Sequence, residues 1–139
     1  MRKIGLKDDD HQCFVCGLEN PHGLRLSWNV EGQTMTTVFT SEQKYQGWKG
    51  ILHGGILATL LDEAMTRLAV ILYGGALTAE MTVRYVAPAR IGEVFYVRGE
   101  VVKESSRLVE MKAFIHERDA SGILVAHATG KVMRRSSAI

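Results

Sequence analysis

Apolar residues recur at helical spacing over one long stretch in the middle of the chain. The stripe consists of Leu57, Leu60, Leu61, Ala64, Leu68, Ile71 and Leu72. This spacing predicts an amphipathic helix, which Gly74 and Gly75 end as a stop signal. A second stripe of the same helix is mostly small and contains one carboxylate. Its members are Gly55, Ala58, Thr59, Asp62, Met65, Thr66 and Ala69.

Alternating and β-branched segments on both sides of this helix predict strands. Before the helix, residues 24–29 and 34–40 form a predicted hairpin that turns at Glu31 and Gly32. After it, four segments end at turn signals, at residues 78–87, 93–103, 107–117 and 123–134. Three consecutive hairpins among them predict an antiparallel sheet, and one helix is available to cover it. The predicted class is α+β, with a curved antiparallel sheet wrapped around one long central helix.

Length and charge narrow the functional classes. The 139 residues predict one domain, with residues 1–23 as an N-terminal extension. The net charge is +2, and no stripe of Lys and Arg interleaves with aromatic residues, so we expect no nucleic-acid partner. The longest apolar runs are far shorter than a membrane span, which predicts no membrane partner. The N-terminus lacks the apolar core of a signal peptide, which predicts a cytoplasmic protein.

The extension contains the motif Cys13-Phe14-Val15-Cys16-Gly17, between His11 and His22. The motif has the shape of a metal knuckle, and the two histidines could complete a Cys2His2 set. There is no second C-x-x-C, however, and the histidine spacing is not that of a zinc finger. Two reduced thiols packed in a tight turn are the leading interpretation. Zinc binding and thiol redox chemistry remain alternatives, and a structural disulfide is not expected in the cytoplasm.

The first turn of the predicted helix contains Gly54 and Gly55. Their unpaired backbone amides and the positive end of the helix dipole lie open to an anionic group. Further along the same helix, the small-residue stripe lets a ligand or another backbone come close to Asp62.

These residues resemble the hotdog-fold acyl-CoA thioesterases, in particular the branch that includes the phenylacetate-pathway enzymes. The resemblance is carried by His53-Gly54-Gly55, by Asp62 nine residues after that histidine, and by segment 78–92, TAEMTVRYVAPARIG. It covers residues 24 to about 134. It implies a hotdog fold and the hydrolysis of an acyl- or aryl-CoA thioester to the free acid and CoA. It implies no cofactor, and we expect no metal in the site.

The chain departs from the family pattern in two places. Where the family often has Asn or Gln six residues before the motif histidine, this chain has Gly47, with Gln46 beside it as a possible substitute. Glu63 directly follows Asp62, but adjacent helical residues point about 100° apart and cannot share one site. Asp62 matches the family position, and Glu63 is expected to pair with Arg67 at i+4.

The resemblance assigns roles to the matching residues. Asp62 acts as general base on water or as nucleophile, and the Gly54 amide donates to the oxyanion, aided by the helix dipole. His53 orients the turn or assists the thioester carbonyl, with a purely structural role as the alternative. Thr78 steadies the water or the carboxylate, or is an ordinary strand residue.

Coenzyme A also brings phosphates, for which guanidinium groups are suited. Arg90 is the first candidate, followed by Arg84, Arg98, Lys103 and Arg107. The acyl tail is expected between helix and sheet. Its predicted boundary residues are Phe39, Met65, Leu68 and Phe95.

Gly54 and Asp62 are eight residues apart, roughly 12 Å along a helix. One thioester carbonyl cannot touch both within one chain, so a site that uses both combines two subunits of a two-fold dimer. The resemblance implies the same arrangement, often as a dimer of dimers. Two other classes remain open, namely a non-catalytic acyl-CoA-binding module and a hotdog dehydratase or hydratase.

Overall fold

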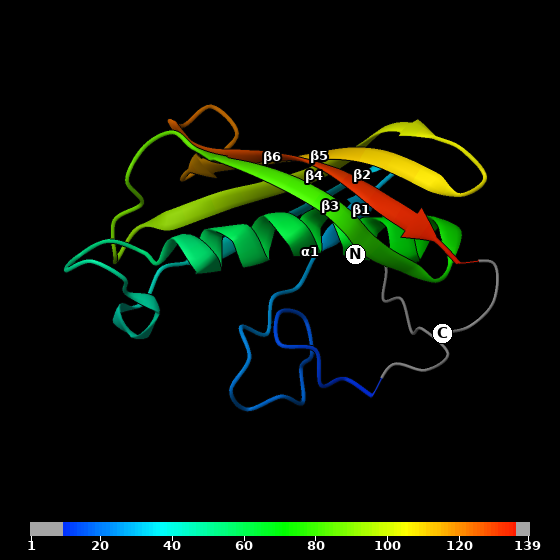
Figure 1. Ribbon diagram of the computed structural model, residues 1–139. Helices are drawn as coiled ribbons and strands as arrows, with labels where there is room; N and C mark the ends of the chain where they lie inside the picture. The colour runs from blue at the N-terminus through cyan, green and yellow to red at the C-terminus, as the bar shows by residue number, and fades with distance from the viewer. Residues whose placement is uncertain (1–9, 136–139) are drawn as a thin grey trace.

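The computed structural model describes residues 10–135 as one six-stranded antiparallel sheet that curves over a single long helix (Figure 1). The strands are β1 (Asn29–Glu31), β2 (Thr34–Thr40), β3 (Ala76–Tyr85), β4 (Val94–Glu104), β5 (Leu108–Glu117) and β6 (Leu124–Arg134). The helix α1 (Gly54–Tyr73) is preceded by a short 3-10 helix, η1 (Gln43–Tyr45). The predicted α+β class and hotdog arrangement are confirmed. Residues 1–9 of the predicted extension lie outside the described residues.

The strand order in the sheet is β1-β2-β4-β5-β6-β3, and neighbouring strands are antiparallel. The predicted hairpin between β3 and β4 is wrong, because β3 pairs with β6 and β4 pairs with β2. The connection between β3 and β4 binds the loop before α1 instead. Leu52 N–H donates to Ala89 O at 2.7 Å, and Ile91 N–H donates to Gly50 O at 2.9 Å. As a result, β3 is an edge strand, and it runs close to α1 (Figure 1).

The helix packs closely against the concave side of the sheet. Its buried residues are Leu57, Leu60, Leu61, Ala64, Met65, Leu68 and Ala69. Met65 and Ala69 thus belong to the core, although their spacing placed them on the small-residue stripe. Glycines in the strands allow this close approach. A Cβ at Gly99 on β4 would lie 2.1 Å from Ala64 O, and one at Gly130 on β6 would lie 2.9 Å from Met65 Sδ.

The predicted strand at residues 24–29 is wrong for most of its length, since β1 contains only Asn29–Glu31. The backbone before β1 pairs with the cysteine-containing turn rather than with β2. Leu24 N–H donates to Phe14 O at 2.7 Å, and Leu26 N–H donates to Val15 O at 2.9 Å. Arg25 between them has a φ of 51°, which interrupts an extended strand.

Among the described residues, no helix combines the length and the apolar character needed to cross a membrane.

Candidate active site

The start of α1 carries a cap that leaves one backbone amide free. His53 is the N-cap residue, and its Nδ1 accepts a hydrogen bond from Gly55 N–H at 2.8 Å. Since Nδ1 is an acceptor, the ring proton of neutral His53 lies on Nε2, which is left as a donor. Within the described residues, no hydrogen bond uses the Gly54 N–H. The helix start therefore offers two donors, Gly54 N–H and His53 Nε2–H, whereas the Gly55 amide predicted to bind substrate is occupied.

The loop before α1 is held by its own hydrogen bonds. Gln46 Oε1 accepts from Gly50 N–H at 2.8 Å, so this side chain closes the loop. Gly47 lies against His53, because a Cβ at position 47 would be 3.1 Å from His53 Cα. The family's Asn or Gln position is thus filled by a glycine, where a Cβ would press tightly against the His53 backbone.

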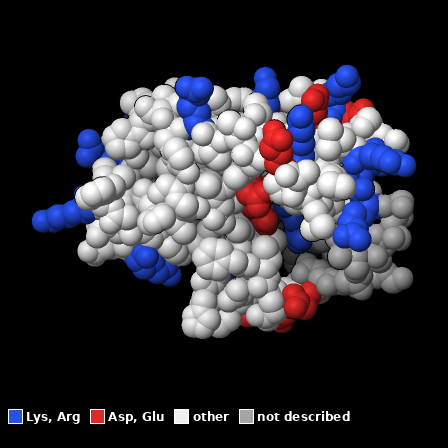
Figure 2. Space-filling view, viewed as in Figure 1, with Lys and Arg blue, Asp and Glu red and all other residues white. Residues whose placement is uncertain are grey.

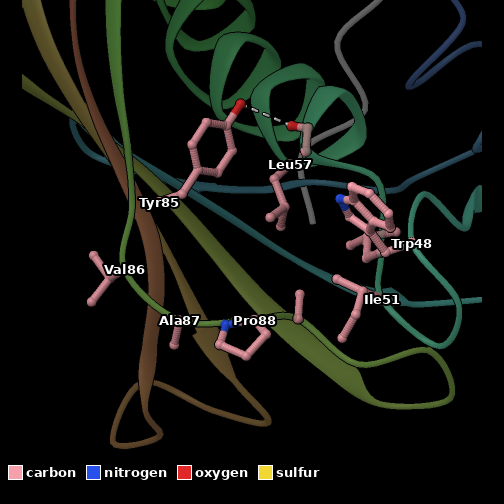
Figure 3. A pocket seen from close by; sticks show the side chains of 10 residues that line it. Trp48, Ile51, Leu57, Tyr85, Val86, Ala87 and Pro88 are labelled. Carbon is pink, nitrogen blue, oxygen red and sulfur yellow. Dashed lines mark hydrogen bonds between the residues drawn. The ribbon is translucent and has the colours of Figure 1, made fainter.

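Three pockets lie at this end of the molecule. One, of about 520 Å³, lies beside Gly54 and is lined by Trp48, Ile51, Leu52, Leu57 and residues 85–89 (Figure 3). Tyr85 of β3 reaches across it and donates its hydroxyl to Gly54 O at 3.0 Å (Figure 3). A second, of about 630 Å³, lies between the cysteine-containing turn and the helix start, and is lined in part by Phe14, Gln46 and His53. A third, of about 560 Å³, is lined by residues that include both His53 and Gly54.

Asp62 lies in the middle of α1 and is held by two threonine hydroxyls. Thr78 Oγ1, on β3, donates to Asp62 Oδ1 at 2.6 Å, and Thr66 Oγ1 donates to the same oxygen at 3.3 Å. The two threonine hydroxyls lie 2.5 Å apart. The second oxygen of Asp62, Oδ2, has no hydrogen-bond partner within the described residues, and the residue as a whole is half-buried.

The sequence-predicted residues therefore form two groups. His53, Gly54, Gly55 and Gln46 lie together at the helix start, while Asp62 and Thr78 lie together two turns further along. The structure does not bring the two groups together within one chain. Thr66 and Tyr85 were missed by the sequence reasoning. Thr66 stood on the small-residue stripe one turn after Asp62, which is the only signal that could have indicated it.

A model of the thioesterase superfamily matches residues 49–122, which is more than half of the chain. The chain belongs to the thioesterase superfamily. The match contains His53, Gly54, Asp62 and Thr78, and it confirms the resemblance found in the sequence.

This thioesterase-superfamily chain is 33% identical to acyl-coenzyme A thioesterase THEM4 of Xenopus laevis over 94 residues, which are 68% of this chain and 42% of that protein. Human acyl-coenzyme A thioesterase 13 is 30% identical over 87 residues, 61% of each chain. The chain thus spans less than two thirds of either relative.

Solved structures share the fold of this superfamily member. The PaaI protein of the E. coli phenylacetic acid degradation operon has a TM-score of 0.76 at 18% identity, covering 84% of this chain and 83% of that one. Protein smu.793 of Streptococcus mutans, bound to acetyl CoA, has a TM-score of 0.75 at 16% identity, covering 82% and 91%. A hypothetical thioesterase of Streptococcus pneumoniae was solved as two alanine mutants. One replaces an aspartate (TM-score 0.70, 21% identity, 80% and 93% coverage). The other replaces a threonine sixteen residues later. Its TM-score is 0.69 at 21% identity, and the match covers 80% of this chain and 92% of that one.

The residues predicted to bind substrate away from the helix start do not line the pockets. Arg84 on β3 and Arg90 after Pro88 are exposed, and neither lines the three pockets described above. Arg90 lies near the helix-start loop through a backbone bridge to Ile51. The residues predicted to bound the acyl tail are closed core. Phe39, Met65, Leu68 and Phe95 are each at most 2% exposed, so the pocket beside Gly54 replaces them as a place for an apolar group.

Glu63 contacts the cysteine-containing turn and also lies near Arg67, the partner predicted for it. Its Oε2 lies 3.7 Å from Cys13 Sγ, and the ligand atoms of Glu63, Cys13 and Cys16 all lie within 4.8 Å of one another. Arg67 is close enough to lower the pKa of Glu63, but burial is the larger effect and raises that pKa to about 7. A hydrogen bond from Cys16 lowers the pKa of Cys13 to about 5, and the same bond and burial raise the pKa of Cys16. Glu63 thus faces the cysteine-containing turn rather than the Asp62 group.

Proposed function

We propose that this protein hydrolyses acyl- or aryl-CoA thioesters, with Asp62 as the reacting carboxylate. The observation that carries the proposal is the Asp62 group. One carboxylate oxygen is fixed by the hydroxyls of Thr66 and Thr78, and the other is left for a water or a thioester carbon. A non-catalytic binding module has no need of a carboxylate placed in this way. Thr78 acts as a positioning residue, which is the first of its two predicted roles.

The reaction needs a base or nucleophile and a donor for the developing negative charge. In the base route, Asp62 takes a proton from water, and the resulting hydroxide attacks the thioester carbon. The carbonyl oxygen becomes an oxyanion that accepts from Gly54 N–H, with His53 Nε2–H as a second donor. The C–S bond then breaks, the acid is released and the CoA thiolate takes up a proton. In the nucleophile route, Asp62 attacks the same carbon and water cleaves the mixed anhydride.

The two groups belong to one site only if two subunits share it. The β3 edge of the sheet supports a homodimer, since β3 is a ten-residue edge strand whose backbone edge is a template for pairing. Large apolar side chains are exposed along and after it, with Leu77, Tyr85 and Val86 each about half exposed. The surface over the start of α1 and the end of β3 is mostly uncharged (Figure 2). A two-fold axis at this edge would give two equivalent sites, and a dimer of dimers can form from such pairs.

Relatives support the substrate class and the carboxylate. THEM4 and thioesterase 13 are named acyl-coenzyme A thioesterases, and the S. mutans protein binds acetyl CoA. The aspartate and threonine replaced in the S. pneumoniae protein are sixteen residues apart, the same spacing as Asp62 and Thr78. Arg90 and Arg84 remain the proposed contacts for the CoA phosphates, and Gln46 offers its free amide group at the pocket that Phe14 also lines. A cytoplasmic location stays a prediction.

The test is thiol release from a panel of aryl, short-chain and long-chain acyl-CoAs. The Asp62→Asn variant should lower kcat by about a hundredfold or more, because it removes the base or nucleophile but keeps the side-chain shape. Glu63→Gln, one residue further along the same helix, should keep most of the turnover. Calorimetry with CoA should show unchanged binding to Asp62→Asn. Saturable acyl-CoA binding without turnover by the unmodified protein would contradict the proposal and indicate a binding module.

A further inference from the structure

The group formed by Cys13, Cys16 and Glu63 has no part in the proposed reaction. Two of its members come from the N-terminal turn, and the third comes from the middle of α1, fifty residues away. All three side chains are half-buried. Of the described residues, these three are the set whose thiol, imidazole or carboxylate atoms converge closely enough to hold a metal ion. Neither His11 nor His22 belongs to the set, so Glu63 takes the place that the sequence offered to histidine.

We propose that Cys13, Cys16 and Glu63 bind one Zn²⁺ ion, which fastens the N-terminal turn to α1. Zinc is held by thiolates at about 2.3 Å and by carboxylate oxygens at about 2.0–2.2 Å. In a tetrahedral site these lengths separate a sulfur and an oxygen ligand by about 3.5 Å. Cys13 Sγ and Glu63 Oε2 are 3.7 Å apart, so this edge of the site needs almost no rearrangement. The other ligand atoms, within 4.8 Å, reach the ion by small side-chain movements.

The backbone of the turn is built to present the two sulfurs. Val15 N–H points at Cys13 Sγ at 3.4 Å, which favours the thiolate that a metal requires. Gly17 N–H donates to Cys13 O at 2.9 Å and closes the turn. A Cβ at Gly17 would lie 2.4 Å from Cys13 N and 2.6 Å from His11 O, so only glycine fits there. The turn is therefore formed by backbone contacts before any ion binds.

The donor set selects the kind of ion. Thiolates favour zinc and cuprous copper over magnesium or calcium, whereas a carboxylate is a harder ligand that suits zinc better than cuprous copper. Three protein ligands leave one tetrahedral position for water. The bound ion holds Phe14 and the rest of the turn against the helix start, where they line the second pocket.

The first experiment measures metal in the full-length protein purified under reducing conditions. We expect about one zinc per chain by mass spectrometry of the metal content. After the metal is removed with a chelator, added Co²⁺ should give the near-ultraviolet thiolate-to-cobalt charge-transfer band, and added Zn²⁺ should abolish it. This band is measured on the unmodified protein, so it does not depend on any variant folding. A metal-free chain that fails to bind Zn²⁺, or one that isolates with a Cys13–Cys16 disulfide, would overturn the proposal.

A pair of neighbouring variants separates this site from the proposed active site. Glu63→Gln should weaken Zn²⁺ binding by about a hundredfold or more, because loss of a direct ligand costs at least as much as loss of a group that orients one. Asp62→Asn, the adjacent carboxylate, should keep the full zinc content while losing thiol release. Cys16→Ser should abolish the cobalt band with both carboxylates intact. Unchanged zinc affinity in Glu63→Gln would show that Glu63 is not a ligand. Zinc binding is measured without turnover, so its failure is distinct from failure of the proposed hydrolysis.

Discussion

The free amide of Gly54 is the smallest feature on which the proposed chemistry depends. It exists because His53 caps the helix through Gly55 N–H and leaves the preceding amide unused. The same bond fixes the histidine tautomer, so one contact sets both predicted donors. A capping role and a role at the carbonyl are therefore compatible for His53.

Two variants at position 54 distinguish the effect of losing the backbone N–H from the effect of adding a side chain. Gly54→Pro removes the N–H at the first helical position, where proline is tolerated. The ψ of 132° at His53 is also compatible with a following proline. We expect kcat to fall by about a hundredfold to a thousandfold, as for loss of one oxyanion donor. The measurement is thiol release at saturating acyl-CoA.

Gly54→Ala is the matched control for this variant. It keeps the amide, and its Cβ would lie 3.5 Å from the Tyr85 ring, an ordinary contact. We expect near-normal turnover. Equal activity of the proline and alanine variants would show that the Gly54 amide takes no part in the reaction.

At the scale of the elements, α1 depends on two glycines in the strands above it. A Cβ at Gly99 would meet the backbone oxygen of Ala64, which cannot move without bending the helix. One at Gly130 would meet the flexible end of Met65. Gly99→Ala should lower the free energy of unfolding by about 1–3 kcal/mol, the usual cost of overpacking, and Gly130→Ala by less. Urea unfolding compares the two, and an equal or larger loss for Gly130→Ala would contradict this account of the packing.

Local patterns were enough to predict α1 and most strands, because each is amphipathic or β-branched over its own length. They failed where the outcome depended on a distant partner. The segment before β1 alternates like a strand, but its amides are taken by Phe14 and Val15. The turn after β3 looks like a hairpin, yet β3 pairs with β6 at the far end of the chain.

In the candidate site, too, residues marked by a local pattern could be predicted, whereas contacts between distant residues could not. Asp62 and Gly54 could be singled out because the helix period and the helix start are visible in the sequence. The contact of Glu63 with Cys13 joins residues fifty positions apart, and no periodicity indicates it. The i+4 spacing pointed to Arg67 instead, which contributes a weaker effect than burial on the pKa of Glu63.

At the scale of the whole molecule, the two groups of predicted site residues do not meet within one chain. Eight helical residues separate Gly54 from Asp62, about 12 Å along the axis. The exposed edge of β3 lies beside the Asp62 group through Thr78, so a second copy that pairs there comes close to the carboxylate. Chemistry that uses both groups then requires assembly, and a monomer should be inactive.

Mixed dimers of two inactive variants test this central claim most directly. Chains carrying Asp62→Asn and Gly54→Pro, each with its own affinity tag, are co-expressed and the doubly tagged species is isolated. In a shared site, one of the two active sites regains both Asp62 and the Gly54 amide, so the mixed dimer should show about half the activity of the unmodified dimer. Each variant alone should stay about a hundredfold or more below it. A mixed dimer as inactive as its parents would show that the groups act within one chain or not together, and would contradict the shared site.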